Sequence, residues 1–300
     1  MKVLVAGFMT IDTIQLPVRT ITSVGGPPCY AGLVCARFGM DVDVITKVGP
    51  DFPDDQSVWL ARNGIRLTPQ DRSANVKTTR FKIAAKGQDR KLVLEQRCED
   101  LSSGQLTQTR YNAALVSPLA GEISASLLAD IAKQSDFTFM DPQGFVRVFD
   151  SEGAVSVSRI KDEGILKSVD AVKMDMEEAE AITGKSSPTD ALSKLSNFGV
   201  RKALLTRGGE TCLVMDGPRF FSVPVPKVQV VDTTGAGDVL AGATISTYIR
   251  SRDFLWSACF GVAASSLSLH MIALSKVDLP MSVDEQARRL YSTASPIAPA

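Results

Sequence analysis

Short, almost continuous apolar runs recur along the chain, and stretches with helical periodicity separate them. The runs are KVLVAGF (2–8), VDVITKVG (42–49), AALVSPL (113–119), FTFMDP (137–142), VDAVKMD (169–175) and KALLTRG (202–208). Strands that are apolar on both faces belong to a parallel sheet with helices on both sides. The sequence therefore predicts an α/β fold with three layers, αβα, and a mainly parallel central sheet. The expected helices cover 27–39, 54–63, 122–134, 176–183, 189–198, 235–250, 254–270 and 283–293.

Two segments depart from this alternation and predict a small β-strand lid. Residues 10–24 and 75–97 are rich in Thr, Val and Ile with polar alternation, and Gly87 supplies a turn in the second segment. Such strands have one face in water and pair in antiparallel fashion. We expect one domain over 1–300 with this lid beside the main sheet. The alternative, additional edge strands without a function, stays open, and the tail 292–300 is expected to be loose.

Composition excludes several classes of function. Lys plus Arg number 33 and Asp plus Glu number 33, so no net charge draws the chain to nucleic acid or to an anionic membrane. The five cysteines form no C-x-x-C pair, which favours reduced thiols in a cytoplasmic protein. The apolar start of the chain is too short for a spanning helix. The one histidine, His270, makes a Ser/His/Asp triad or a multi-histidine metal site a poor explanation.

The stretch VVDTTGAGDVLAGATIS, residues 230–246, predicts an anion site. A strand ends near Val231 and a helix follows, so Gly235, Ala236 and Gly237 lie at a helix N-terminus, where free N–H groups and the helix dipole favour a phosphate. The stretch is neither a Walker A loop nor a G-x-G-x-x-G fingerprint. Asp238 would repel a phosphate unless it accepts the proton of an attacking hydroxyl. The other interpretation is a stabilising helix-terminal charge without catalysis.

The sequence DTTGAGD, the pair Gly25-Gly26 ahead of a predicted helix, and the chain length together resemble the ribokinase-like (PfkB) carbohydrate kinase family. The resemblance covers nearly the whole chain. It implies a ribokinase-like kinase in which Asp238 is the catalytic base and Gly235, Ala236 and Gly237 form the anion hole. It also implies that MKVLVAGFMTID contains the first strand, that this strand ends in Asp12, and that Asp12 binds the substrate. Gly25 and Gly26 would approach the same substrate.

Weaker matches extend the resemblance to other loops. KMDMEEAEAITG resembles a family segment in which an acidic residue organises magnesium, and Glu178 occupies the position of that residue. Asp175 occupies a position where the family usually has Asn, and the resemblance implies that it contacts the nucleotide. The resemblance further implies nucleotide contacts at Thr206 and Gly208, phosphate contacts at Asp141 and Arg147, and adenine and potassium neighbours at Ala263, Ala264 and Ser265. Each of these segments can also be an ordinary loop at a strand end.

The family transfers phosphate to many alcohols, so the acceptor must be inferred from this chain. Tyr30 stands where many ribose-binding members have Asn, which disfavours ribose. The lid contains the polar residues Lys77, Arg80, Lys82, Glu95, Gln96 and Arg97. We expect an ATP-dependent, Mg²⁺-dependent kinase, with K⁺ as a further ion, that passes the γ-phosphate to a sugar or a cyclic polyol such as myo-inositol. Alternatives are a nucleoside kinase and a non-catalytic regulatory protein; the protein is expected as a monomer or as a homodimer through the lid.

Overall fold

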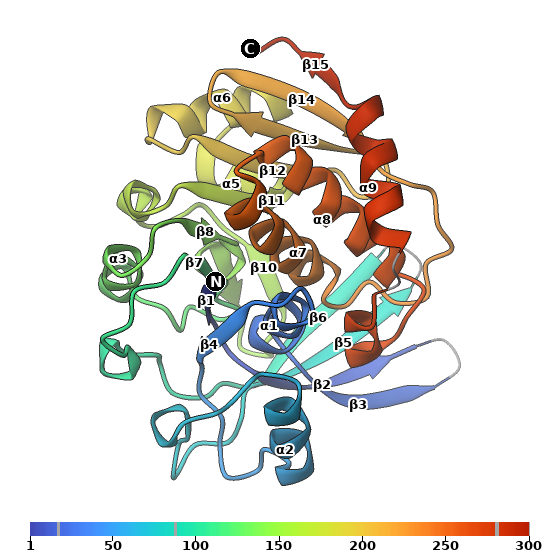
Figure 1. Ribbon diagram of the computed structural model, residues 1–300. Helices are drawn as coiled ribbons and strands as arrows, with labels where there is room; N and C mark the ends of the chain where they lie inside the picture. Colours follow the sequence, from blue (N-terminus) through green and yellow to red (C-terminus); the bar gives the residue numbers. More distant parts are fainter. Residues whose placement is uncertain (17–18, 87–88, 280–281, 300) are drawn as a thin grey trace.

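A nine-stranded sheet forms the centre of the protein, in the order β15-β14-β13-β12-β11-β8-β7-β1-β4 (Figure 1). The structure is a computed structural model and describes residues 1–16, 19–86, 89–279 and 282–299. The parallel strands are β1 (Lys2–Ala6), β4 (Asp41–Ile45), β7 (Ala113–Val116), β8 (Thr138–Met140), β11 (Ala171–Asp175) and β12 (Lys202–Thr206). The antiparallel strands are β13 (Thr211–Asp216), β14 (Arg219–Pro224) and β15 (Ser295–Ile297). The prediction of a mainly parallel sheet is confirmed.

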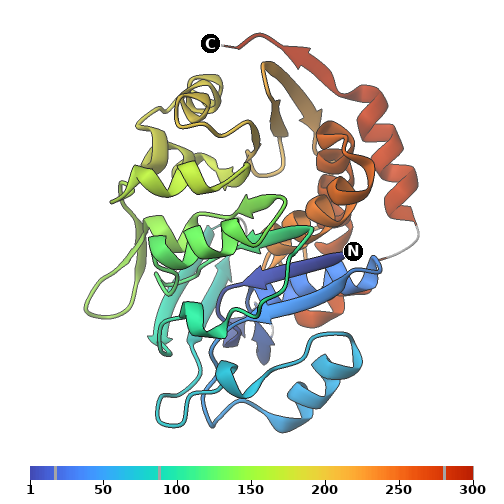
Figure 2. The same ribbon diagram turned by 60° about the vertical axis from the view of Figure 1, so that its left-hand side comes forward.

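Helices cover both faces of this sheet, which lies between two helical layers in Figure 2. One layer contains α1 (Pro27–Arg37), α7 (Ala236–Ser251), α8 (Phe254–Ser268) and α9 (Ser282–Thr293). The other contains α3 (Ala125–Lys133), α5 (Met176–Thr183) and α6 (Pro188–Asn197). Val3 and Val5 of β1 belong to the first core, whereas Leu4 and Ala6 belong to the second. This alternation explains why the strands are apolar throughout.

Local sequence signals fix where several helices begin. Pro27 and Pro28 open α1, where their missing N–H groups cost nothing. The Asp253 side chain caps α8 by accepting from the Trp256 N–H. The remaining helices are α2 (Asp54–Arg62) and α4 (Gln143–Val146) and the 3₁₀ turns η1 (Pro69–Asp71), η2 (Ser103–Gln105), η3 (Glu163–Ser168) and η4 (Ala273–Val277). Each expected helix is observed with bounds within three residues of those expected, whereas α4 and the 3₁₀ turns were not expected.

A second sheet lies beside the first, in the order β3-β2-β5-β6 (Figure 1). Its strands are β2 (Thr10–Gln15), β3 (Thr20–Gly25), β5 (Arg80–Lys86) and β6 (Asp89–Gln96). Both segments that were expected to form a lid therefore pair in one small sheet, and β2 runs parallel to β5. The expected turn at Gly87 lies outside the described residues. The hairpin of β9 (Arg147–Phe149) and β10 (Val155–Val157) lies next to β6, where Leu94 donates to the Gly153 carbonyl at 2.8 Å.

Two expectations from the sequence need correction. The tail is not entirely loose, because β15 pairs with β14 and so adds a strand to the edge of the main sheet. Asp12 does not end the first strand of the main sheet; it lies on β2 and pairs with Ser23 of β3. The chain leaves β1 at Ala6 and enters the small sheet at Thr10, so the apolar run 2–8 ends before Asp12 is reached.

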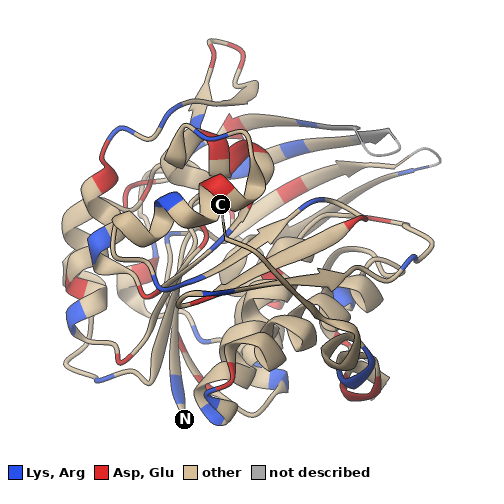
Figure 3. Cartoon of the chain, turned by 90° about the horizontal axis from the view of Figure 1, so that it is seen from above, with Lys and Arg blue, Asp and Glu red and all other residues tan. Residues whose placement is uncertain are grey.

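The remaining global features follow the composition. All five cysteines are buried. Acidic and basic residues are interspersed over the molecule in Figure 3. No helix in the described ranges is both long and apolar enough to cross a membrane.

Helix α7 packs so closely against α1 that the backbones of the two helices are in contact at Gly242 and Ala31. A Cβ added at Gly242 would lie 2.7 Å from the Ala31 carbonyl oxygen. We expect Gly242→Ala to lower the free energy of unfolding by about 1–3 kcal/mol, because the helices must separate to admit the methyl group. Urea unfolding measures this. Gly209→Ala is the control, since an added Cβ there meets nothing within 4 Å; equal stability of the two variants would contradict the packing argument.

Candidate active site

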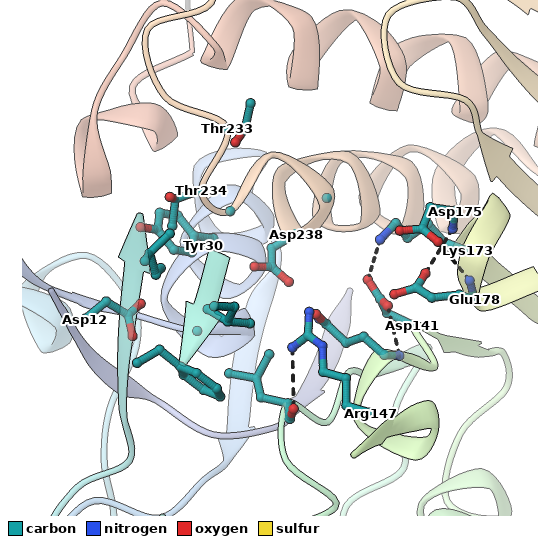
Figure 4. Close-up of a pocket in the computed structure, with 18 residues that line it drawn as sticks. Asp12, Tyr30, Asp141, Arg147, Lys173, Asp175, Glu178, Thr233, Thr234 and Asp238 are labelled. Atoms are coloured by element: carbon teal, nitrogen blue, oxygen red, sulfur yellow. Dashed lines mark hydrogen bonds and ion pairs between the residues drawn. The ribbon is translucent and has the colours of Figure 1, made fainter. Parts of the chain in front are cut away.

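A cavity of about 180 Å³, partly open to solvent, lies where the small sheet meets the carboxyl ends of the parallel strands (Figure 4). Ligands of open α/β sheets bind at this edge. The lining residues come from the small sheet, from the strand ends and from the start of α7. They are Asp12, Gly26, Tyr30, Phe81, Ile83, Leu92, Leu119, Asp141, Gln143, Arg147, Lys173, Asp175, Glu178, Thr233, Thr234, Gly235, Gly237 and Asp238. The cavity thus joins segments from most of the chain.

The first turn of α7 forms one wall of the cavity. Gly235 is the N-cap with φ +73°, a left-handed conformation that favours glycine. A Cβ at Gly235 would lie 2.7 Å from the ring of Tyr30, and one at Gly237 would lie 2.9 Å from Lys173 Nζ. Ala236 differs from its neighbours, because its N–H donates to the Thr233 carbonyl at 3.2 Å and it does not line the cavity. The geometry leaves Gly235 and Gly237 as the members of the predicted anion hole that face the cavity.

Asp238 follows in the same turn and points into the cavity (Figure 4). Arg147 reaches into the cavity from β9, and its Nη1 donates to the Leu119 carbonyl at 3.4 Å. The carboxylate of Asp238 lies in the first turn of α7, at the positive end of the helix dipole.

Asp12 lies on the opposite side of the cavity and is 5% exposed. Gly25 makes room for it, because a Cβ at Gly25 would lie 2.4 Å from Asp12 Oδ2. Gly26 has φ +86°, and a Cβ there would lie 2.1 Å from the Phe8 carbonyl oxygen. The two glycines thus bring the chain between β3 and α1 against the start of the small sheet. Asp12 and Gly26 line the cavity, whereas Gly25 does not line it and packs against the Asp12 side chain.

Tyr30 lies on α1 beneath Gly235 and is buried. Its hydroxyl has no hydrogen-bond partner among the described residues. Burial, together with the negative charges of Asp12 and Asp232, raises the pKa of the Tyr30 hydroxyl well above its ordinary value. Tyr30 is therefore a neutral donor and acceptor whose ring supports the loop before α7.

The expectation of a polar lid wall is wrong. Phe81 and Ile83 of β5 and Leu92 of β6 face the cavity. Alternate residues of a strand point to opposite faces, so Lys82 of β5 points to the other side. Two of the polar residues serve elsewhere: Arg80 pairs with Asp51 at 2.7 Å, and Arg97 donates to the Ala120 carbonyl at 2.9 Å. The small sheet thus presents an apolar surface to whatever the cavity binds.

A buried ion pair joins β11 to the loop after β8. Lys173 Nζ lies 2.7 Å from Asp141 Oδ2, and the Asp141 side chain is 1% exposed. Burial lowers the pKa of Lys173, but Asp141, Glu178 and Asp175 raise it more, so the net pKa lies above its ordinary value. Lys173 therefore stays charged, and its ammonium group abuts the first turn of α7 at Gly237.

Asp175 and Glu178 form a reciprocal capping box at the start of α5. The Glu178 N–H donates to Asp175 Oδ1 and the Asp175 N–H donates to Glu178 Oε2, both at 2.9 Å. Burial raises the pKa of Glu178 to about 7, although Lys173 opposes this. Both carboxyl groups line the cavity, so the capping box also places two oxygen ligands beside it.

Several residues implied by the resemblance do not line the cavity. Thr206 ends β12 beside Asp175, and its hydroxyl lies 3.4 Å from the Met174 carbonyl oxygen. Gly208 lies in the turn that follows, with φ +60°. Ala263, Ala264 and Ser265 lie on α8, and the Ser265 hydroxyl donates to the Ala236 carbonyl at 2.9 Å. None of these residues lines the cavity.

Lys173 and Gln143 are cavity residues that the sequence analysis did not identify. Lys173 is an isolated charge inside the apolar run VDAVKMD, which is a usable signal for a buried, paired lysine. Gln143 had no such signal; its side-chain amide lies 3.3 Å from Ser117 Oγ, a contact that depends on the fold.

The charges of the cavity are predominantly negative. Five carboxyl groups and two basic side chains line it: Asp12, Asp141, Asp175, Glu178 and Asp238, and Arg147 and Lys173. A polyphosphate entering this cavity needs additional positive charge. Within the described ranges, no cluster of three or more His, Cys, Asp or Glu side chains is arranged to hold a metal ion. Mg²⁺ commonly binds through one or two carboxylates plus substrate phosphates and water, and Asp175 and Glu178 can supply such carboxylates.

Residues 12–274 match the profile of the family described as "pfkB family carbohydrate kinase". The chain is 24% identical to a cytidine kinase of Thermococcus kodakarensis, over 84% of this chain and 90% of that protein. It is also 24% identical to an inositol 3-kinase of Arabidopsis thaliana, over 93% of this chain and 77% of that protein. A pyrophosphate-dependent kinase in the ribokinase family, solved with a pyrophosphate analog and myo-inositol, superimposes with a TM-score of 0.79 at 22% identity, covering 92% and 98% of the two chains.

The fold and the family match together define a kinase with the ribokinase-like fold, that is, a phosphotransferase that acts on a hydroxyl group. The chain belongs to the pfkB family of carbohydrate kinases. The resemblance inferred from DTTGAGD is thereby confirmed.

The contact between Gly235 and Tyr30 gives a first prediction for the site. Gly235→Ala should disturb the first turn of α7, because the new Cβ meets the ring at 2.7 Å. Gly217→Ala is the matched control: its φ of +60° carries the same backbone strain, about 1–3 kcal/mol, but its Cβ meets nothing within 4 Å. Both variants should lose thermal stability, and only Gly235→Ala should lose turnover. Equal turnover in both would mean that this contact does not shape the site.

The raised pKa of the buried Glu178 predicts that the stability of the protein depends on pH. Its pKa of about 7 in the folded protein lies above the ordinary value of 4.5, so the folded state holds a proton that the unfolded state has released. Stability of the metal-free wild type should therefore fall as pH rises from about 4.5 to about 7, and Glu178→Gln should remove this part of the slope. Melting temperatures across this window test it. The exposed Glu177→Gln is the control and should keep the wild-type slope.

Proposed function

We propose that this protein is an ATP-dependent kinase that transfers the γ-phosphate to a hydroxyl group of a sugar or a cyclic polyol such as myo-inositol. One observation carries the proposal: Asp238, the first turn of α7 and Asp12 open into a single cavity. A potential base, an anion site and a partner for acceptor hydroxyls are thus available to one substrate complex.

In the proposed reaction, the acceptor hydroxyl hydrogen-bonds to Asp12 and places its oxygen at Asp238. Asp238 accepts the hydroxyl proton while the oxygen–phosphorus bond forms and the bond to the leaving phosphate breaks. The N–H groups at the start of α7 and the Lys173 ammonium hold the negative charge of the transferred group. The acceptor oxygen, the transferred phosphorus and the leaving oxygen must be in line for this step, so positioning supplies much of the rate.

Mg²⁺ belongs to the proposal because the cavity residues fit it. Asp175 and Glu178 line the cavity with carboxylate oxygens, the ligand type that Mg²⁺ prefers, and the surplus of carboxyl groups requires a cation for a polyphosphate to enter. The ion would neutralise donor phosphate charge. Thr206 and Gly208 stay predicted nucleotide contacts; they follow β12, the neighbour of β11, at the same edge of the sheet.

A nucleoside kinase is the second candidate, and the apolar wall is compatible with it. Phe81, Ile83 and Leu92 offer a surface on which a nucleobase can pack. The same surface suits the C–H face of a cyclic polyol, so it does not separate the two acceptor classes. The inositol 3-kinase and the cytidine kinase among the relatives support one candidate each. A non-catalytic regulatory protein has less support, since Asp238 and Gly235 both line the cavity.

A product assay separates these candidates. The purified protein is incubated with Mg²⁺, with either ATP or pyrophosphate, and with a panel of sugars, inositols and nucleosides, and phosphorylated products are detected by ³¹P NMR. We expect product with ATP and a sugar or inositol, and none without Mg²⁺. Product only with nucleosides would support the nucleoside kinase instead. Product only with pyrophosphate would show that pyrophosphate, and not ATP, is the phosphate donor. No product with any pair would contradict the kinase proposal.

The role of Asp238 has its own test. Asp238→Asn keeps the shape of the side chain but removes the basic oxygen, so turnover should fall by about a hundredfold to ten-thousandfold while ATP binding survives. Asp190→Asn in the first turn of α6 is the control for a simple helix-terminal charge. It should cost about 0.3–1 kcal/mol of stability and leave turnover intact. The same behaviour in Asp238→Asn would remove Asp238 as the base.

The small sheet is further proposed to act as a lid that excludes water from the transferred phosphate. The formation of a homodimer through this lid stays a prediction. Its β6 edge is already covered at Leu94 by Gly153, so a homodimer formed through the lid would have to use β3. Size-exclusion chromatography of the protein distinguishes this dimer from a monomer.

A further inference from the structure

A second buried lysine lies beneath the loop that leads into α7. Lys276, on η4, is 0% exposed. Its ammonium donates to the carbonyl oxygen of Asp232 and lies 3.3 Å from that of Ser268, the last residue of α8. The Asp232 carboxylate is 3.7 Å away and is also buried. Lys276 thus stands as a positive charge surrounded by backbone and carboxylate oxygens.

Asp232 connects this charge to the predicted anion site. Asp232 Oδ1 accepts from the Thr234 N–H at 2.8 Å, and Oδ2 accepts from the Ala273 N–H at 3.3 Å. The preceding residue, Val231, donates to the Leu269 carbonyl at 2.8 Å. Three segments therefore meet at the ammonium group: the loop before Gly235, the end of α8, and η4.

The oxygens around Lys276 are of the kind that also bind potassium. Rings of carbonyl oxygens replace the hydration shell of K⁺, and a lysine ammonium carries the same charge and donates three hydrogen bonds to oxygens of this kind. A cation is further favoured at the C-terminal end of α8, where the helix dipole is negative. Removing one member of a buried pair leaves the other charge uncompensated, so Asp232 requires a positive partner.

We propose that Lys276 is a covalently tethered cation that positions the loop 232–235, so that the kinase proposed above works without a monovalent metal ion. The family resemblance implies K⁺ near Ser265, whose carbonyl oxygen already accepts from the Ser268 hydroxyl at 2.7 Å. The K⁺ does not fit this end of α8, because the Lys276 ammonium already engages the carbonyl oxygens of Asp232 and Ser268. A free ion dissociates when its concentration falls, whereas a tethered ammonium is always present at a high effective concentration. Lys276 is a positioning residue, since it acts through Asp232 and not on the substrate.

The wild-type protein provides the first test. Turnover and melting temperature are measured in chloride salts of K⁺, NH₄⁺ and choline at an ionic strength of about 0.1 M. We expect the same values in all three salts. A saturable rise of turnover or melting temperature with K⁺ would overturn the proposal, and this arm needs no variant to fold.

Two variants of Lys276 give the second test. Lys276→Ala leaves a space lined by oxygens, whereas Lys276→Met fills the same space with an apolar chain. In choline chloride both should lose turnover by about a hundredfold, because the loop shifts. Added NH₄⁺ or K⁺ should restore turnover and melting temperature of Lys276→Ala in a saturable manner, but not those of Lys276→Met. Lys202→Ala is the matched control: it removes a lysine paired with Asp216 away from the cavity and should not respond to the choice of cation.

The outcomes separate this inference from the proposed function. Full turnover of Lys276→Ala in choline, or the same response to NH₄⁺ in the Ala and Met variants, would overturn the role of Lys276. Absence of kinase activity in the wild type would contradict the proposed function alone. In that case the cation dependence of the melting temperatures still decides the inference, since a bound ion stabilises the folded state whether or not the protein is a kinase.

Discussion

The site depends on one steric constraint: the first turn of α7 lies at backbone distance from side chains of two other elements. Gly235 rests on the ring of Tyr30 from α1, and Gly237 abuts the ammonium of Lys173 from β11. The contact with the Tyr30 ring and the φ of +73° require a glycine at 235, whereas a Cβ at 237 would displace the end of the Lys173 side chain. Because the turn is held this closely, Asp238 projects into the cavity formed by the small sheet and the strand ends. Packing between the layers therefore determines where the proposed base is placed.

Much of this arrangement was predictable from the sequence, and what was missed has a common cause. The apolar runs predicted the parallel strands, and the glycine-rich stretch 230–246 predicted the N-terminus of α7. Asp12, Tyr30, Glu178 and Asp238 all line one cavity, as the resemblance implied.

The errors concern which way side chains face and which charges are buried. The sequence R-F-K-I in β5 alternates, and only the fold shows that Phe81 and Ile83 face inward. Lysine is almost always exposed, so Lys276 gave no signal of burial. The place of Asp12 on β2 depends on a bend in the chain that residue patterns do not specify.

The assignment of Asp12 to the small sheet has a consequence for selectivity. Asp12, which is proposed to hold the acceptor, belongs to the small sheet. Helix α7, which is proposed to hold the phosphoryl group, belongs to a layer that covers the main sheet. The chain around Gly7 and Gly26 joins the two parts. No single element fixes the separation between them. An acceptor that fits poorly against Phe81 and Ile83 would alter how the small sheet rests on the main sheet, and with it the approach of the hydroxyl to Asp238. Discrimination between acceptors would then be expressed in turnover as well as in affinity.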